Sequence, residues 1–242
     1  MALRSWPEAV YAVGDVHGCY DLLLQLEAAI VADAASISGD KLIVMVGDYV
    51  DRGPRSASVL DHLSGPAPAG FERICLVGNH EAMMLRFAAS PSRRNLWLDN
   101  GGIETLMSYG MRADDLQEAS QRSLRTLIDF HLPSEHLEFL RGLALTLSLP
   151  GAIFVHAGVR DGVPLAQQTE HDLLWSRPSP ELGHGDVLVV HGHTPATEPV
   201  VTPTRICIDT GAFATGVLSA VRLAQGKAPA IITTRDQLNA AK

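Results

Sequence analysis

The sequence predicts an α/β fold in which two β-sheets lie face to face and helices cover their outer faces. Three observations lead to this prediction. Apolar runs alternate with segments of helical periodicity between residues 9 and 80, which is typical of β-α-β units with parallel strands. Helical patterns dominate about 81–142. Strand patterns then return between 143 and 234, and loops of hairpin length join some of them.

The N-terminal part of the chain supplies the β-α-β run. Residues 9–15 form an apolar strand, and residues 19–33 carry apolar side chains at helical spacing. Residues 41–48 are a continuous apolar run, as expected of a strand buried on both faces. A short helix is expected at about 55–63, and residues 72–80 form the third strand. We therefore expect these strands to be parallel neighbours in one sheet.

The remainder of the chain supplies the outer helices and the second sheet. Region 81–142 is rich in helical patterns, and we expect it to pack as a helical cap beside the sheets. One domain spanning 1–242 is expected, because a chain of this length can bury one large core. A second sheet, mixed or antiparallel, is expected from the later strand patterns, which are 143–151, 152–158, 186–193, 205–211, 216–224 and 228–234.

The composition excludes several classes of protein. The 242 residues are 46% apolar and 19% charged, which is ordinary for a globular protein. No stretch approaches the roughly 20 apolar residues of a membrane span. The first apolar run leads directly into a predicted strand instead of forming a signal peptide, so we expect a cytoplasmic protein. The net charge of −8 and the lack of a basic run argue against nucleic acid or membrane as partner.

The sequence gives little information about the role of the cysteines or about the oligomeric state. Cys19, Cys75 and Cys207 are widely spaced, which suggests neither a disulfide framework nor a zinc knuckle. We expect Cys75 and Cys207 to be small apolar residues within strands. No pattern in the chain indicates an oligomeric state.

Polar motifs follow the predicted strands at the points where α/β sheets bind ligands. GDVHG at 14–18, GDYVDRG at 47–53 and GNHE at 78–81 each come directly after an apolar run. Their Asp, His and Asn side chains offer oxygen and imidazole donors that suit divalent metals. One block alone would fit a tight turn, but three blocks in this order are poorly explained that way. The sequence therefore predicts a two-metal hydrolase.

Individual side chains of these motifs have distinct expected roles. Asp15 and His17 are two residues apart and would point the same way on an extended backbone. Asp48 can bridge two metals, because a carboxylate has lone pairs for both. Asn79 ends the third predicted strand and offers a neutral carbonyl oxygen. His80 follows it directly and would diverge from it, so that it faces the leaving group.

Histidines at the ends of later predicted strands supply further nitrogen donors. His156 closes the run 152–158, and His191 and His193 close the run 186–193. The Gly-His-Thr-Pro context favours His193 as a ligand. His191 is expected to pack in the core or to contact a ligand, with direct coordination left open.

Phosphate binding requires positive charge at this site. Asp15 and Asp48 repel a phosphate dianion, whereas two divalent cations would reverse the sign of the local charge, so metals are expected to serve substrate binding too. Arginine binds phosphate through parallel hydrogen bonds. The candidate arginines are Arg52 within GDYVDRG, Arg177 after LLWS and Arg160 after HAGV.

These motifs resemble the signature of the phosphoprotein phosphatase family of metallophosphoesterases. GDVHG, GDYVDRG and GNHE match its first motifs, and HAG at 156–158 and HGHTP at 191–195 are similar to its later histidine motifs. WLDNGG at 97–102 and WSR at 175–177 are similar to bacterial and phage members. Eukaryotic members have HGG where this chain has HAG. The resemblance, over about 10–216, is therefore to a bacterial or phage-type serine/threonine protein phosphatase.

The resemblance implies a calcineurin-like metallophosphoesterase fold, an αββα sandwich, with a dinuclear metal site. Manganese is the metal implied for bacterial members, with iron, zinc, nickel and cobalt as alternatives. Asp48 would belong to both metals. The implied ligands are Asp15, His17 and Asp48 for one metal and Asp48, Asn79, His156 and His193 for the other.

The resemblance also implies the reaction. A metal-bridging hydroxide would attack phosphorus directly, without a covalent phosphoenzyme. His80, paired with Asp51, would be the general acid, and Arg52 and Arg177 would bind the phosphate. The substrate would be a phosphorylated protein carrying phosphoserine or phosphothreonine, with phosphotyrosine or a small phosphoester as alternatives.

Other functions remain to be weighed against this one. A dinucleoside tetraphosphate hydrolase is the main alternative, but its symmetrical subfamily lacks the VDRG continuation and has NHD in place of NHE. Asp51, Arg52 and Glu81 therefore favour a monoester phosphatase. A non-catalytic scaffold on the same fold would have lost ligands or His80, and a nuclease would carry a basic patch.

Overall fold

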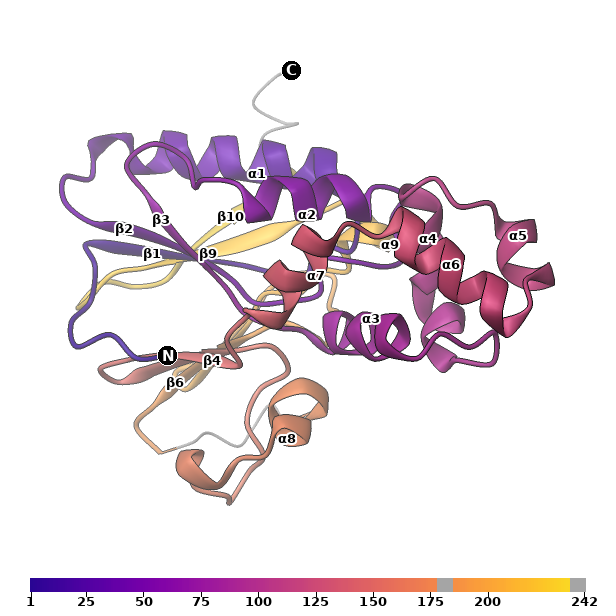
Figure 1. The fold of residues 1–242 in the computed structure, drawn as a ribbon. Coiled ribbons are helices and arrows are strands. Elements are labelled where there is room, and N and C mark those ends of the chain that lie inside the picture. The colour runs from indigo at the N-terminus through magenta and orange to yellow at the C-terminus, as the bar shows by residue number, and fades with distance from the viewer. Residues whose placement is uncertain (178–184, 236–242) are drawn as a thin grey trace.

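Two five-stranded sheets face each other in the computed structural model, which describes residues 1–177 and 185–235 (Figure 1). The first sheet has the order β10-β9-β1-β2-β3 and the second β4-β5-β6-β8-β7. The strands of the first sheet are β1 (Ala9–Val13), β2 (Lys41–Met45), β3 (Glu72–Cys75), β9 (Ser219–Leu223) and β10 (Ala230–Thr233). Those of the second are β4 (Thr146–Leu149), β5 (Ala152–Val155), β6 (Leu188–His191), β7 (Val200–Val201) and β8 (Arg205–Cys207).

The pairing of strands confirms the parallel core and corrects the position of the last two strands. β1, β2 and β3 are parallel, and so are β5, β6 and β8. The sequence placed 216–224 and 228–234 in the second sheet. Instead β9 runs antiparallel to β1, and β10 pairs with β9. The reason is that β1 is wholly buried, so its free edge needs a partner for its N–H and C=O groups.

Alternation along the strands explains the layers. In β1, Val10 and Ala12 face the core between the two sheets, whereas Tyr11 and Val13 face the helices outside. Phe154 and Val190 fill the same core from the second sheet. Helices α1 (Tyr20–Asp33) and α2 (Ser56–Ser64) cover the outer face of the first sheet, and α8 (Glu170–Trp175) lies outside the second (Figure 1). The fold is thus the αββα sandwich that the resemblance implied.

The helical region lies at one end of the sandwich (Figure 1). Phe87, Trp97 and Leu106 anchor it in the core that α1 and α2 share. Its role as a cap stays a prediction. Its elements are α3 (Asn79–Ala89), the π-helix η2 (Leu98–Gly102), α4 (Ile103–Ser108), α5 (Ala113–Glu118), α6 (Gln121–His131) and α7 (Ser134–Arg141). Shorter helical turns elsewhere are η1 (Ala34–Ser36), η3 (Leu165–Gln167) and α9 (Ala212–Thr215).

The third motif lies at the start of a helix and not at the end of a strand. β3 ends at Cys75, and Asn79 and His80 form the first turn of α3. The Glu81 side chain accepts a hydrogen bond from the Gly78 N–H (2.9 Å), which satisfies an N–H at the helix start. The prediction that Asn79 ends the strand is therefore wrong, although it still lies just beyond the carboxyl end of β3.

None of the helices within the described ranges has both the length and the apolar character needed to cross a bilayer. The cytoplasmic location expected from the sequence stays a prediction.

Candidate metal centre and active site

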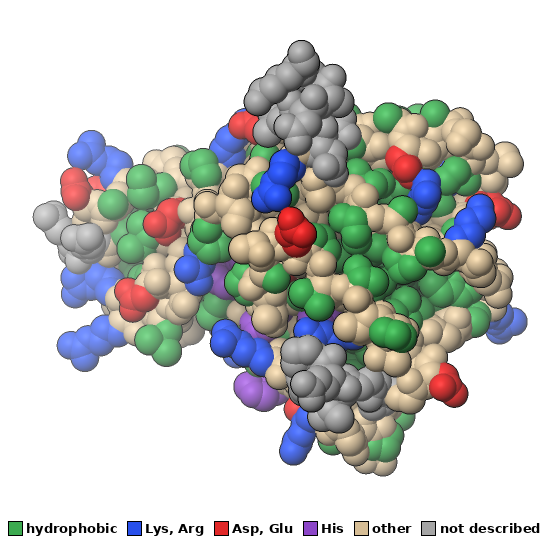
Figure 2. Space-filling model, turned by 180° about the vertical axis from the view of Figure 1, so that it is seen from behind, with side chains coloured by type: hydrophobic (Ala, Val, Ile, Leu, Met, Phe, Trp, Pro, Cys, Tyr) green, Lys and Arg blue, Asp and Glu red, His purple; other side chains and the backbone are tan. Residues whose placement is uncertain are grey.

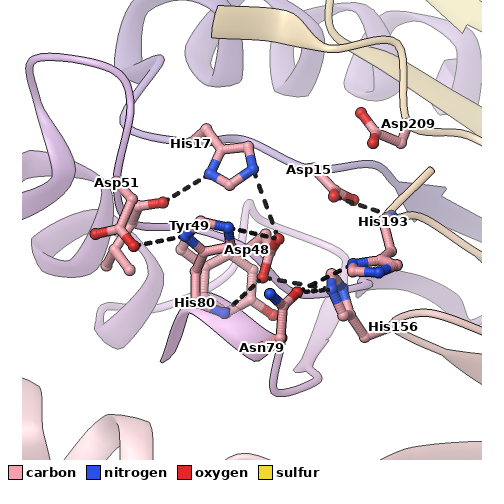
Figure 3. Close-up of polar contacts among 12 residues, drawn as sticks. Asp15, His17, Asp48, Tyr49, Asp51, Asn79, His80, His156, His193 and Asp209 are labelled. Atoms are coloured by element: carbon pink, nitrogen blue, oxygen red, sulfur yellow. Dashed lines mark hydrogen bonds and ion pairs between the residues drawn. The ribbon is translucent and has the colours of Figure 1, made fainter. Parts of the chain in front are cut away.

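The polar motifs meet where the parallel strands of both sheets end (Figure 3). Asp15 follows β1, Asp48 follows β2, His156 follows β5 and His193 follows β6. The His193 N–H donates a hydrogen bond to Asp15 Oδ2 (3.0 Å), which joins the two sheets at this edge. The site is therefore formed by loops from both sheets, at the edge where open α/β sheets bind ligands.

Asp48 lies at the centre of this arrangement. Its Oδ2 is 3.5 Å from His17 Nε2, and its Oδ1 is 3.4 Å from His156 Nε2. Two groups of side chains whose donor atoms could share a cation both contain Asp48: one adds His17 and His80, the other His156 and His193. Its two carboxylate oxygens thus face different partners, as a bridging carboxylate requires.

Main-chain carbonyls orient two of the histidine rings. His17 Nδ1 lies 2.8 Å from the Val50 carbonyl, and His156 Nδ1 lies 3.1 Å from the Val46 carbonyl. Since a carbonyl only accepts, Nδ1 carries the proton in each ring and Nε2 is left with a lone pair towards Asp48. Burial lowers the pKa of both imidazoles, which keeps them neutral. Neutral rings oriented in this way are suited to bind metal.

Buried acceptors are concentrated around Asn79 and Asp15. Asn79 Oδ1 lies 2.7 Å from His156 Nε2 and 3.1 Å from His193 Nδ1. Asp15 Oδ1 is buried and has no hydrogen-bond partner among the described residues. Burial and the nearby carboxylates of Asp209 and Asp48 raise the pKa of Asp15. This set of carboxylate, amide and imidazole donors fits two divalent metal ions of the manganese, iron or zinc type.

Left-handed backbone brings His17 into the site. The sequence predicted an extended backbone that turns Asp15 and His17 the same way, but His17 has a φ of 43°. The N–H groups of Val16 and His17 both donate to the Asp48 carbonyl (3.0 and 2.9 Å), which turns the chain. His17 reaches Asp48 from this turn and not from an extended backbone. Asp15 belongs to neither candidate ligand group among the described residues.

His80 and Asp51 form a buried pair beside Asp48. His80 Nδ1 is 2.6 Å from Asp51 Oδ2, and His80 Nε2 is 3.9 Å from Asp48 Oδ2. Burial alone would lower the pKa of His80, but the carboxylates of Asp48 and Asp51 raise it to about 9. The ring is therefore able to carry a proton at neutral pH and to present its Nε2–H towards Asp48.

Two acidic residues contribute that sequence reasoning did not assign to the site. Asp209 follows β8 and is 4% exposed, with its carboxylate next to that of Asp15. Its signal in RICIDTG is an Asp directly after an apolar strand, as for the predicted ligands. Glu81 accepts hydrogen bonds from the N–H groups of Asp48 (2.8 Å) and Tyr49 (2.7 Å), and so fixes the loop that carries Asp48.

The predicted arginines take three different positions. Arg52 is exposed, and its guanidinium lies 5.3 Å from the centre of the Phe213 ring. The Phe213 and His17 rings form a T-shaped pair. Arg177 is exposed. Burial is the main cause of the lowered pKa of His193, and the nearby charge of Arg177 contributes to it. Arg160 lies 3.9 Å from Asp172 of α8. Figure 2, seen from behind, shows arginine or lysine side chains beside histidines near the middle of this face.

His191 does not belong to either candidate ligand group among the described residues. It is fully buried in β6, and its Nδ1 lies 2.8 Å from the Gly192 carbonyl. Burial lowers the pKa of His191 to about 3, so the ring is neutral. This position favours packing over coordination.

Comparisons with known proteins identify the family. Residues 9–215 match the family described as calcineurin-like phosphoesterase. The chain is 31% identical to serine/threonine-protein phosphatase 2 of Salmonella typhimurium over 87% of this chain and 90% of the relative. It is 28% identical to the asymmetrical bis(5'-nucleosyl)-tetraphosphatase PrpE of Oceanobacillus iheyensis, over 87% of this chain and 86% of the relative.

Solved structures share the fold. A putative diadenosine tetraphosphatase superposes with a TM-score of 0.67 at 22% identity and covers 96% of both chains. A mutant cold-active protein tyrosine phosphatase superposes with a TM-score of 0.65 at 18% identity, over 95% of this chain and 78% of the other. The family predicted from the motifs is confirmed: the chain belongs to the calcineurin-like phosphoesterases and is a metal-dependent phosphoester hydrolase.

Proposed function

We propose that this protein is a protein phosphatase that hydrolyses phosphoserine and phosphothreonine, and also phosphotyrosine, with two divalent metal ions, of which manganese is the preferred one. The observation that carries the proposal is the buried pair of His80 and Asp51 beside Asp48. An alkoxide is a poor leaving group unless it is protonated, so a positioned acid matters most for phosphoserine and phosphothreonine. The Salmonella relative, named as a serine/threonine phosphatase, supports this choice.

The residues divide into three tasks. When bound, the metals would lower the charge of the phosphate and activate a water molecule for in-line attack. Arg52 and Arg177 would bind the non-bridging oxygens and hold the phosphorus in line. His80 would give its Nε2 proton to the leaving oxygen while Asp51 holds the Nδ1–H. The residues that would hold the metals are Asp15, His17, Asp48, Asn79, His156 and His193.

Hydrolysis of dinucleoside tetraphosphates is the second candidate. It is favoured by the relative from Oceanobacillus, which matches over the same share of this chain. Phe213 supports it too, because its ring is 43% exposed beside Arg52 and His17 and offers a face on which a nucleobase could stack. The same ring would suit phosphotyrosine. The leaving group of a tetraphosphate is itself an anion that departs readily, so this function depends less on His80.

The test compares substrates and one variant. The expected kcat/KM with manganese is highest for phosphoserine and phosphothreonine peptides, lower for phosphotyrosine and lowest for diadenosine tetraphosphate. His80→Asn is expected to keep its metals and to lose about 10²–10⁴ in rate on the peptides, the usual scale of general acid catalysis.

The control is His62→Asn, since His62 forms a similar pair with Glu27 (2.7 Å) at α2. It should retain full activity. Loss of metal from His80→Asn by elemental analysis would make His80 a ligand and not the acid. A higher kcat/KM for diadenosine tetraphosphate than for any phosphopeptide would replace the first candidate with the second.

A further inference from the structure

Asp51 is held by side chains of the helical region. The Trp97 indole Nε1–H donates to Asp51 Oδ2 (2.7 Å), and the Thr105 hydroxyl donates to Asp51 Oδ1 (2.7 Å). His80 Nδ1–H donates to the same Oδ2 (2.6 Å). Asp51, Trp97 and Thr105 are fully buried, and His80 is 6% exposed. Each oxygen of the carboxylate therefore has a partner that lies outside the metal-ligand residues.

The same segment also packs on the backbone of Asp51 and Arg52. Both residues have left-handed φ angles, 75° and 67°, which persist only where their surroundings fix them. Gly101 of η2 lies so close that a Cβ there would be 2.5 Å from Arg52 N and 2.9 Å from Asp51 Cβ. A Cβ on Gly102 would likewise meet the Trp97 ring at 2.6 Å. The motif WLDNGG thus supplies a donor and a close-fitting surface to the same short loop.

We propose that Trp97 and Thr105 are positioning residues for the general acid: they fix the Asp51 carboxylate, which in turn fixes His80 towards the leaving oxygen. This inference rests on the proposed function, in which His80 is the acid. With one oxygen held by Thr105 and the other shared by Trp97 and His80, the carboxylate cannot rotate without losing a buried hydrogen bond. Loss of either donor frees that rotation and misplaces the proton, whereas the metal-ligand residues keep their own contacts.

Leaving groups of different acidity separate this role from simple packing. Phenyl phosphate releases a phenol with a pKa of about 10, like that of tyrosine, and needs the acid. p-Nitrophenyl phosphate releases a much more acidic phenol and needs the acid far less. A variant with a misplaced His80 should therefore lose activity mainly on phenyl phosphate. A variant with a generally disturbed core should lose activity on both substrates equally.

The experiment measures kcat/KM for both substrates with manganese, together with metal content. Trp97→Phe keeps an aromatic ring but removes the N–H, and Thr105→Val keeps the shape but removes the hydroxyl. Each is expected to lose about 10- to 100-fold on phenyl phosphate, as for a lost hydrogen bond to a charged group, and much less on p-nitrophenyl phosphate. Thr105→Ser, which retains the hydroxyl, should recover most of the activity.

Two further variants complete the design. Trp6→Phe is the matched control, because the Trp6 Nε1–H also donates a hydrogen bond, to the Pro150 carbonyl (2.8 Å), away from the candidate site. It should leave kcat/KM for both substrates unchanged. His80→Asn is the benchmark, and adding Trp97→Phe to it should cause no further loss, because the proton donor is already absent.

The outcomes separate the inference from the proposed function. Equal losses on both substrates in Trp97→Phe and Thr105→Val, or no loss, would overturn the positioning role. If His80→Asn itself lowers kcat/KM equally for both substrates, His80 is not the acid and the proposed function fails first. If His80→Asn loses activity mainly on phenyl phosphate and the other two variants do not, only the positioning role fails.

Discussion

The two halves of the candidate site are held in place by different kinds of contact. In the metal-ligand half, main-chain carbonyls of Val50 and Val46 orient the rings of His17 and His156. In the acid half, side chains of the helical region hold Asp51. A carbonyl is present whatever the side chain, whereas an indole N–H or a hydroxyl is not. The metal half should therefore depend on its ligands and on the fold, and the acid half on particular supporting residues.

The largest effect is expected from Asp48→Asn. Asp48 belongs to both candidate ligand groups, so its neutralisation should weaken both metals at once. Changes to residues that merely support ligands already cost about 10–100-fold in affinity or activity, and a larger loss is expected here. The kcat/KM values for phenyl phosphate and p-nitrophenyl phosphate should fall by the same factor. The measurement is metal content with kcat/KM on both substrates.

Asp40→Asn provides the control for that prediction. Asp40 is exposed and directly precedes β2, whereas Asp48 follows the same strand at its other end. Its neutralisation should leave metal content and activity unchanged. A fully metallated and active Asp48→Asn protein would contradict the central position given to this carboxylate.

Strand patterns in the sequence point to the candidate ligands more directly than to the residues that support Asp51. Asp15, Asp48, His156 and His193 each follow an apolar strand, and parallel strands bring their carboxyl ends to one edge. Asp209 carries the same signal and was overlooked. The roles of Trp97 and Thr105 were not predicted, because they depend on how distant helices pack.

The patterns in the sequence also left part of the fold unpredicted. Strand periodicity identifies 216–224 as a strand, but the choice between two sheets depends on which edge is left open. β9 pairs with the buried edge of β1, and this choice requires knowledge of the whole sheet. The start of α3 at Asn79 was missed because the apolar run of β3 continues to Val77 without a break in its pattern.

The titration of His80 in metal-free protein tests whether the neighbouring carboxylates hold a proton on its ring. The carboxylates of Asp48 and Asp51 outweigh burial and raise its pKa from an ordinary 6.5 to about 9. Because the folded pKa is raised, the stabilisation from this proton is fully present below about pH 6.5. It is lost as the pH rises through about 9. NMR titration of the His80 ring should give the raised midpoint, and Asp51→Asn should lower it. A midpoint at or below 6.5 in the unmodified chain would contradict the pairing.

Gly101→Ala should disturb the acid half through its backbone. The φ of Gly101 is 107°, and a Cβ would be 2.5 Å from Arg52 N. A displacement of about 1 Å can cost on the order of 10²-fold in rate, and we expect roughly 10- to 100-fold on phenyl phosphate. Gly151→Ala is the matched control, since Gly151 has a φ of 77° and no described atom lies within 4 Å of an added Cβ. Both variants should lose stability from the unfavourable φ, by about 1–3 kcal/mol. If both retain full activity, the contact with Arg52 has no influence on the acid.

Val50→Ala should have the smallest effect on activity, although Val50 provides the acceptor for His17. The side chain is fully buried, so its truncation should cost about 2 kcal/mol of unfolding free energy. The carbonyl that accepts from His17 Nδ1 remains, so metal content and kcat/KM of the folded protein should stay close to the original values. Val59→Ala in α2, also fully buried, is the control and should show the same loss of stability. A loss of metal in Val50→Ala but not in Val59→Ala would mean that the side chain itself places the carbonyl, and the contrast between a backbone-held and a side-chain-held half would then disappear.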